Sequence, residues 1–301
     1  MDLKQIEYFV HVAELGSFTR AAALLAVAQS AISRQVRLLE VELEQTLLDR
    51  NGRGVTSTEA GKRLLMHGRG ILQQVERTRQ ELKDVKGAPV GHVTIGVPPS
   101  VGRVLTMPLV DEFRSRFPKA ALRVVEGLTA YIVEWLVTGR VDIGLIHNPV
   151  LSPLIEISPL IEEPLYLICR ARGRGGRGRP DRPVPLREMA RYPLIIPSRP
   201  HAIRMQIEMR MANAGLKMNV AWEIDGITAI LDLVRAGRGY AVMPIHAITG
   251  SEDTLVARPI VRPKLASVLA LATPTKRPLT PLTRGVVDVV RELAPTRLRP
   301  A

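Results

Sequence analysis

Residues 16–43 read GSFTRAAALLAVAQSAISRQVRLLEVEL. The spacing of their apolar residues predicts two helices, Phe18–Leu25 and Gln29–Leu43, separated by a brief break. Gly16 ends the helix that precedes them, and Ser17 suits the N-cap of the first. Two short helices joined by a turn of three or four residues form a helix-turn-helix. We therefore expect that motif near the N-terminus.

The second of these helices is polar on one side. The polar side chains on that side are Gln29, Ser30, Ser33, Arg34 and Arg37. Glutamine and arginine have the geometry for paired hydrogen bonds to adenine and guanine edges in the major groove. The pattern predicts a DNA-reading helix, in which Gln29, Ser33 and Arg34 contact the bases.

A hairpin is predicted directly after the helix-turn-helix, where residues 48–56 read LDRNGRGVT. Asn-Gly between strand-like residues is a strong signal for a β-hairpin. Arg50 and Arg53 flank this turn, where they would contact phosphates or enter a minor groove. A helix-turn-helix followed by a hairpin is the winged variant of the motif.

A long amphipathic helix is predicted from Thr58 to about Lys86, and Gly87-Ala88-Pro89 ends it. Its apolar residues recur with a seven-residue period, which is typical of a short coiled-coil seam and implies a dimer. The predicted dimer contacts are Leu64, Ile71, Val75 and Leu82. The alternative is that this face packs against its own chain.

From Val90 onward, predicted strands alternate with predicted helices. The first set follows the order βαβαβ and comprises Val93–Val97, Met107–Arg116, Leu122–Val125, Ala130–Thr138 and Val141–Ile146. That order implies a parallel sheet with helices on both faces. A second set begins with strand Tyr166–Cys169 and closes with strand Val268–Ala272 and helix Arg284–Leu293. Two such lobes would place a cleft at the carboxyl ends of their strands.

Composition restricts the class of protein. The chain has 301 residues, 46% of them hydrophobic, which is ordinary for packed domains. Its apolar stretches, such as Leu165–Cys169, are far shorter than the ~20 residues that a bilayer core demands. No signal peptide is recognisable, and the single cysteine, Cys169, excludes an internal disulfide framework. We expect a soluble cytoplasmic protein with no membrane partner.

The net charge of +13 is unevenly distributed along the chain. Residues 1–87 hold 13 Lys and Arg against 11 Asp and Glu, whereas the remainder holds 29 against 18. Charge alone therefore points away from the predicted DNA-reading helix. The Arg/Gly-rich segment Arg170–Arg179 is either a nucleic-acid-binding stretch or, as we favour, a solvated surface loop.

The motifs of common enzyme classes are missing from the sequence. It contains no Walker or dinucleotide-type glycine loop, no HExxH, no paired-cysteine metal spacing and no GxSxG. We therefore expect no catalytic role, no cofactor and no metal. Six scattered histidines leave an unfamiliar catalytic site as an alternative, and a small-molecule-binding protein without regulatory role is another.

The sequence resembles the LysR-type transcriptional regulators. The resemblance rests on runs that extend over nearly the whole chain: Gly16–Ala22, Gln29–Val36, Leu47–Arg50, Thr56–Gly61, Gly139–Gly144 and Gly237–Pro244. It implies an α/β protein with an all-α, winged N-terminal part. The implied domains are a winged helix-turn-helix DNA-binding domain over residues 1–58, a dimerisation linker helix over 59–88 and a two-lobed periplasmic-binding-protein-like effector domain over 89–301. Lobe I would cover about 89–163 and 266–301, and lobe II about 164–265.

The sequence departs from the family pattern at the start of the DNA-reading helix. Ser30 stands where the family usually has proline, and Ala28 where serine often caps the helix. Losing a cap costs about 1 kcal/mol. We expect Ser30 to take over as the cap, with a shifted helix start.

By resemblance, an effector site lies between the lobes at the strand ends. The candidate residues are Ser100, Val101, His147, Ser198, Arg199, His201, Arg204 and Thr228. Hydroxyls and free backbone N–H groups beside helix N-termini suit a small organic anion. Ser100 and Thr228 have the alternative of simply capping helices, and Arg204 that of a solvated helical charge.

The function that the resemblance implies is a dimeric or tetrameric transcriptional regulator gated by a small-molecule effector. Its partners would be double-stranded promoter DNA, the effector and RNA polymerase. The runs Arg53–Thr56 and Ile196–Ser198 look most like the nitrogen assimilation control subgroup. Some members of that subgroup act without a coinducer, so a ligand-independent regulator governed by its own abundance stays open.

Overall fold

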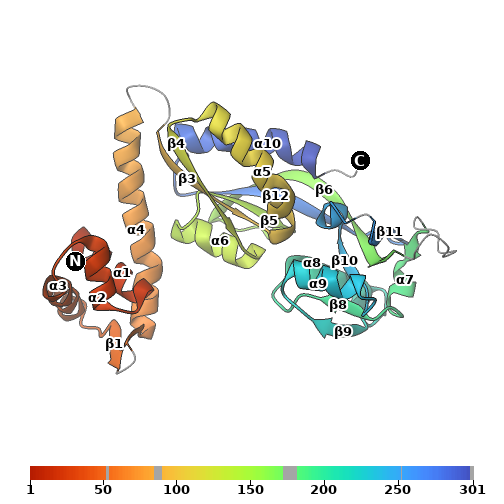
Figure 1. Ribbon diagram of the computed structural model, residues 1–301, viewed down its shortest axis with the longest axis horizontal. Coiled ribbons are helices and arrows are strands. Elements are labelled where there is room, and N and C mark those ends of the chain that lie inside the picture. The colour runs from red at the N-terminus through yellow and green to blue at the C-terminus, as the bar shows by residue number, and fades with distance from the viewer. Residues whose placement is uncertain (52–53, 85–89, 172–181, 252, 299–301) are drawn as a thin grey trace. The chain divides into compact units, whose positions relative to one another are not determined.

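The computed structural model describes residues 1–51, 54–84, 90–171, 182–251 and 253–298. The chain divides into two compact units (Figure 1). The first comprises residues 1–87 with 138–140, and the second comprises 88–137 and 141–301. The Arg/Gly-rich segment falls almost entirely outside the described residues.

The first unit contains the predicted helix-turn-helix and the predicted hairpin. Its elements are α1 (Leu3–Leu15), α2 (Phe18–Leu25), α3 (Gln29–Glu42), β1 (Leu48–Asn51), β2 (Gly54–Ser57) and α4 (Glu59–Asp84). Local caps set the boundaries: Gly16 ends α1 with φ +62°, and the Ser17 hydroxyl accepts a hydrogen bond from the Arg20 amide. The winged helix-turn-helix is thus confirmed in the structure.

One detail of α3 differs from the prediction. The helix starts at Gln29, and its N-cap residue is Ala28, which makes no side-chain cap hydrogen bond. The expected shift of the cap to Ser30 is wrong. The first turn is stabilised instead by the burial of Ile32, at 0% exposure.

The core of the first unit is built where α1, α2 and α3 meet. Phe9, Val12, Ile32, Val36 and Leu39 are fully buried there. Helix α4 packs on this core through α1. A methyl group added at Gly68 would lie 3.0 Å from an Ile6 methyl, so glycine permits the close approach of the two helices.

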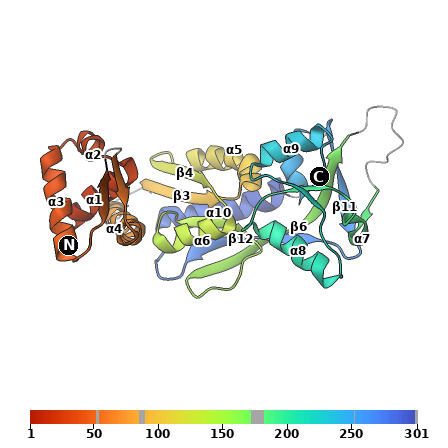
Figure 2. The same ribbon diagram turned by 90° about the horizontal axis from the view of Figure 1, so that it is seen from below.

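The second unit begins with a sheet flanked by helices on both faces (Figures 1 and 2). Its elements are β3 (Gly91–Val97), α5 (Pro99–Arg116), β4 (Ala120–Glu126), α6 (Thr129–Thr138), β5 (Ile143–His147), β12 (Ala266–Pro274) and α10 (Pro281–Arg297). Helices α5 and α10 cover one face with a shared apolar core, and α6 covers the other. Strands β4, β3 and β5 run parallel as predicted, but β12 is antiparallel to β5, so the sheet is mixed.

Strand β6 (Ile155–Arg170) continues from this sheet into a second lobe. The other elements of that lobe are β7 (Val184–Pro185), α7 (Leu186–Met189), β8 (Leu194–Ile196), α8 (Ala202–Asn213), β9 (Val220–Glu223), α9 (Ile227–Arg235), β10 (Ala241–Pro244), η1 (Ile245–Ile248) and β11 (Leu255–Val261). Strand β6 pairs with β12 as far as Pro164, and with β10 and β11 from Leu165 onward. The chain returns to the first lobe between β11 and β12, so two crossing segments join the lobes.

Most predicted elements have somewhat different bounds in the structure, and three of the differences concern elements near the junction of the lobes or the start of a helix. Helix α5 starts at Pro99 rather than at Met107, because proline is well tolerated in the first helical turn. The strand predicted over Val141–Ile146 is β5, which ends at His147. The strand predicted over Tyr166–Cys169 is only the second half of β6.

No helix in the described part of the chain is long and apolar enough to cross a membrane.

Candidate functional sites

A polar, exposed surface covers one side of α3. Gln29, Ser30, Arg34 and Arg37 are exposed, and Ser33 is half-buried. The opposite side of the helix carries the buried Ile32, Val36 and Leu39. The predicted DNA-reading side chains are therefore free to meet a partner, as a major-groove helix requires.

Arg50 of the hairpin lies beside α3. Its guanidinium carbon is 4.4 Å from the centre of the Phe18 ring, and Nη2 donates a hydrogen bond to the Ser33 hydroxyl over 3.3 Å. A cation over an aromatic face is stabilised by the ring quadrupole. This contact holds the charge of an exposed arginine next to the polar side of α3. Arg53, the other predicted hairpin contact, lies outside the described residues.

The predicted dimer seam on α4 is partly buried within its own unit. Leu64 and Ile71 pack against the core formed by α1, α2 and α3. Val75 is half-buried, and the side chain of Leu82 lies outside the described residues. For Leu64 and Ile71, packing on the same chain is thus observed, whereas the dimer role of the seam stays a prediction.

The second unit contains a partly open cavity of about 70 Å³ between its two lobes. Its lining comes from the carboxyl ends of strands and from the first turns of α5, α6, α8 and α9. The lining is mostly apolar. Its polar side chains are Ser100, Thr129, His147, His201 and Asp225.

Three of the predicted effector residues meet in this cavity, namely Ser100, His147 and His201. The other five do not line it. Val101 is buried in the core beneath α5, and Thr228 is exposed on α9. Arg199 is exposed and pairs with Glu208 at 2.9 Å.

Arg204 lies outside the cavity lining, and its donors are engaged by protein groups. The residue is 7% exposed. Its Nε donates to Glu208 over 2.9 Å, Nη1 to the Pro197 carbonyl over 2.8 Å and Nη2 to Glu223 over 2.9 Å. It joins α8 to β9 and to the segment after β8. In this structure Arg204 therefore stabilises the lobe rather than facing the cavity.

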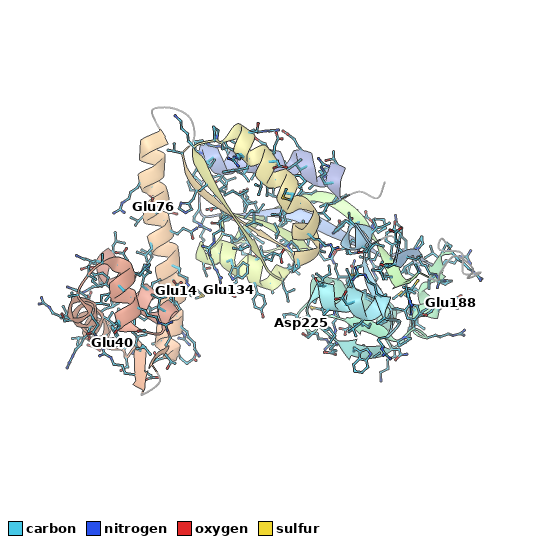
Figure 3. All side chains as sticks on the ribbon, viewed as in Figure 1. Glu14, Glu40, Glu76, Glu134, Glu188 and Asp225 are labelled. Atoms are coloured by element: carbon cyan, nitrogen blue, oxygen red, sulfur yellow. The ribbon has the colours of Figure 1, made fainter. Side chains whose placement is uncertain are left out.

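Ser198 is likewise engaged within the protein. Its backbone N–H donates to Asp225 Oδ1 over 2.8 Å, and its hydroxyl donates to the same oxygen. These bonds hold the pKa of Asp225 below its usual range, because they stabilise the carboxylate. Asp225, labelled in Figure 3, is therefore a fixed negative charge in the cavity lining.

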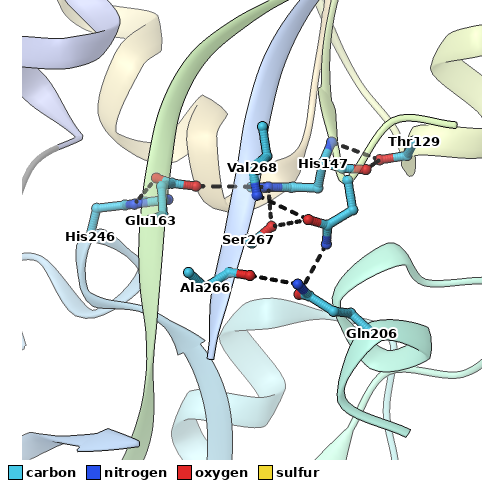
Figure 4. A network of polar contacts seen from close by, with 9 residues as sticks. Thr129, His147, Glu163, Gln206, His246, Ala266, Ser267 and Val268 are labelled. Atoms are coloured by element: carbon cyan, nitrogen blue, oxygen red, sulfur yellow. Dashed lines mark hydrogen bonds and ion pairs between the residues drawn. The ribbon is translucent and has the colours of Figure 1, made fainter. Parts of the chain in front are cut away.

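His147 connects the cavity to a buried polar network (Figure 4). Its Nδ1 lies 3.2 Å from the Ser267 hydroxyl and 3.7 Å from Glu163 Oε2, while Glu163 Oε1 lies 3.0 Å from His246 Nδ1. His147, Glu163 and His246 are each at most 4% exposed. Burial, together with the charges of the neighbouring histidines, lowers the pKa of His147 to about 3.

His201 caps α8 through a hydrogen bond that its ring accepts from the Arg204 amide over 3.5 Å. Burial lowers the pKa of His201 to about 4, with Arg204 adding to the shift and Asp225 opposing it. Both cavity histidines are therefore neutral at physiological pH.

Sequence reasoning missed two polar residues of the cavity, Thr129 and Asp225. Each follows a strand of its lobe, β4 and β9 respectively. The strand-end rule that selected Ser100 also applies to them. Within the described residues, no group of His, Cys, Asp and Glu side chains has the arrangement of a metal site.

Comparison with known proteins agrees with this architecture. A family model described as bacterial regulatory helix-turn-helix protein, lysR family, matches residues 3–62, and the LysR substrate binding domain matches residues 86–295. The chain is 33% identical over 296 residues to the nitrogen assimilation regulatory protein nac of Escherichia coli strain K12, covering 96% of this chain and 94% of that protein.

The protein nac of Klebsiella aerogenes is 32% identical over 299 residues, covering 97% of this chain and 95% of that protein. Among solved structures, full-length CbnR complexed with its target DNA has a TM-score of 0.73 and 24% identity, covering 97% of this chain and 99% of that chain. At 24% identity, the similarity to CbnR shows only that the two folds are alike.

Proposed function

This chain belongs to the LysR family, as a DNA-binding transcriptional regulator with an effector-binding domain, and on that premise we propose how its residues perform the two tasks. The exposed polar side of α3, with Arg50 held beside it, is the observation that carries the proposal. We assign residues 1–58 to DNA binding, 59–88 to dimerisation and 89–301 to effector binding.

In the proposed DNA complex, α3 enters the major groove. Gln29, Ser33 and Arg34 contact base edges, with Ser30 and Arg37 on the same side. Arg50 contacts the backbone, and Arg53 is proposed to do the same. Two such units in a dimer or tetramer would read two half-sites, and RNA polymerase is a proposed further partner.

Substitution of the two kinds of contact distinguishes base reading from backbone binding. Arg34→Ala is expected to weaken binding to a duplex selected from random sequences by about 1–3 kcal/mol and to relax specificity at one base pair. Arg50→Ala is expected to weaken binding to all DNA sequences alike and to reduce the salt dependence of binding. Arg114→Ala, an exposed change on α5, is the matched control.

Fluorescence anisotropy over a salt series measures both effects. Undiminished affinity and specificity in Arg34→Ala would contradict the role of that residue in reading bases. An equal loss in Arg114→Ala would show that general charge, rather than α3, drives the binding.

We further propose that the interlobe cavity holds the effector, a small organic molecule with an anionic group. The lobes meet around the cavity and are joined through β6 and the β11–β12 connection, so a ligand that contacts both lobes would change the angle between them. Ser100 and His201, one from each lobe, are the proposed first contacts. The cavity is small, which keeps a ligand-independent regulator as the second candidate.

A further inference from the structure

The cavity presents one formal charge to a ligand, and that charge is negative. Asp225 is the only charged side chain among the described lining residues at neutral pH, and none of them is a lysine or arginine. His147 and His201 are neutral, because burial lowers the pKa of each. A ligand that was only an anion would find no cationic side chain and would face a carboxylate.

The backbone nevertheless favours a negative group in part of the same cavity. The first turns of α5, α6, α8 and α9, helices of 9 to 18 residues, contribute to the lining. Unpaired N–H groups and the helix dipole stabilise anions at such ends. In α5, Pro98 and Pro99 have no N–H, so the Ser100 amide is the first backbone donor of that helix. Ser100, half-buried in the first turn of α5, adds a hydroxyl donor.

His147 supplies an independent sign that a ligand binds here. Its Nδ1 edge contacts Ser267 and Glu163, whereas its Nε2 is buried with no hydrogen-bond partner among the described residues. The residue is 4% exposed and lines the cavity. Leaving a buried polar atom unpaired costs about 1–3 kcal/mol. Because Nε2 has no accessible surface in this structure, a polar ligand could hydrogen-bond it only after the ring turns toward the cavity, and that bond would remove the cost.

We propose that the cavity binds a small zwitterion of the α-amino acid class. Its carboxylate lies at the first turns of α5 and α6 beside Ser100, and its ammonium group lies at Asp225. Asp225 is suited to that part because Ser198 occupies its Oδ1, which leaves Oδ2 for the ligand. The inference rests on the proposed effector role of the cavity and specifies its chemistry.

The size and apolar lining of the cavity restrict which amino acids can bind. A volume of about 70 Å³, in a cavity that is partly open to solvent, favours a small ligand. Ile203, Ile230, Val242 and Met243 supply apolar surface for a short side chain. We therefore expect alanine-sized amino acids to bind better than charged or aromatic ones.

The test is calorimetric titration of the full-length protein with L-alanine, with propionate, which lacks the ammonium group, and with ethylamine, which lacks the carboxylate. We expect L-alanine to bind at least tenfold more tightly than either. Asp225→Asn keeps an oxygen for Ser198 but removes the charge, and should weaken L-alanine binding at least tenfold. Asp232→Asn, an exposed change on α9, should leave it unchanged. Unfolding midpoints establish that both variants fold.

The outcomes separate this inference from the proposed function. Propionate that binds as tightly as L-alanine, and more tightly to Asp225→Asn, would identify a plain anion site; that overturns the zwitterion while the effector role stands. Absence of binding by all three compounds, with specific DNA binding intact, would overturn the zwitterion but would not contradict an effector of another class. Binding of ethylamine alone would overturn the carboxylate contact.

Discussion

Replacement of Arg204 by alanine distinguishes a structural arginine from an anion clamp. The side chain is 7% exposed and donates to three acceptors on different segments. Its loss would leave the Pro197 carbonyl without that donor and Glu208, 22% exposed, without its buried partner. Glu223 is 51% exposed, so water can solvate its carboxylate after the substitution. The loss of this contact therefore adds little to the cost in stability.

These contacts set the size of the effect. Breaking a buried ion pair by removing one partner costs about 3–5 kcal/mol, and partly exposed acceptors bring the value to the lower end. We expect Arg204→Ala to lower the free energy of unfolding of the second unit by about 3 kcal/mol. Arg199→Ala removes an arginine that contacts the same Glu208 but is 67% exposed. The Arg199→Ala substitution should lower the free energy of unfolding by less than about 0.5 kcal/mol.

Urea unfolding followed by tryptophan fluorescence suits this comparison, because both tryptophans, Trp135 and Trp222, belong to the second unit. Trp222 precedes Glu223 in β9, so the probe lies beside the perturbed contact. An Arg204→Ala protein with wild-type stability and abolished ligand binding would refute the reasoning. Equal losses in Arg199→Ala and Arg204→Ala would also refute it, since burial would then not decide the cost.

Three further changes have definite expected outcomes. Gly61→Ala should cost at least about 2 kcal/mol in urea unfolding, because the new Cβ would lie 2.0 Å from the Leu47 carbonyl oxygen. His201→Asn keeps a cap acceptor but removes a titrating group. The wild type should lose about 2 kcal/mol more stability than this variant between pH 7.5 and pH 5, since the unfolded chain takes up the proton near pH 6.5 and the folded chain only near 4. Phe18→Leu should weaken DNA binding about two- to fivefold by releasing Arg50.

Matched controls keep these outcomes interpretable. Gly68→Ala would meet side-chain methyl groups of Ile6 and Val10, at 3.0 and 3.1 Å, rather than a backbone oxygen at 2.0 Å, and should be milder than Gly61→Ala. His67→Asn, an exposed change on α4, is the matched control for the His201 substitution. Parallel pH profiles for wild type and His201→Asn would contradict a lowered pKa. Wild-type DNA affinity in Phe18→Leu would show that the ring does not position the arginine.

The N-terminal unit was predictable nearly to the residue because its signals are local. Gly16 and Ser17 mark a helix end and a helix start within the sequence itself, and the apolar period gives the buried side of α3. The cap at Ala28 was the exception. There, tertiary packing replaces a side-chain hydrogen bond, and no local pattern reveals it.

The second unit was predictable in its order of elements but less so in its long strand. Pro159 and Pro164 interrupt the sequence of β6 and favour a break. The structure accommodates Pro159 at a register shift against β12 and Pro164 where the strand changes partners. Both accommodations depend on strands about a hundred residues away. A single-sequence pattern therefore gave only the apolar second half.

The cavity shows a similar division between local and long-range information. Ser100 and His147 follow from the rule that ligands bind at strand ends. Arg204 shows the limit of that rule, because its partner Glu208 is visible at helical spacing but Glu223 comes from another strand. Burial turns a helical arginine into part of the framework, and burial is a property of the assembled lobe.

The buried network gives ligand binding a physical route to the lobe connections. His147 lines the cavity, and its Nδ1 edge meets Ser267 of β12 and Glu163 of β6, residues that are paired across the two strands. Glu163 directly precedes Pro164, where β6 passes from one lobe to the other. In the proposed complex, a ligand that engaged Nε2 would fix the orientation of the ring and would thereby act on both crossing segments at the point where the lobes join.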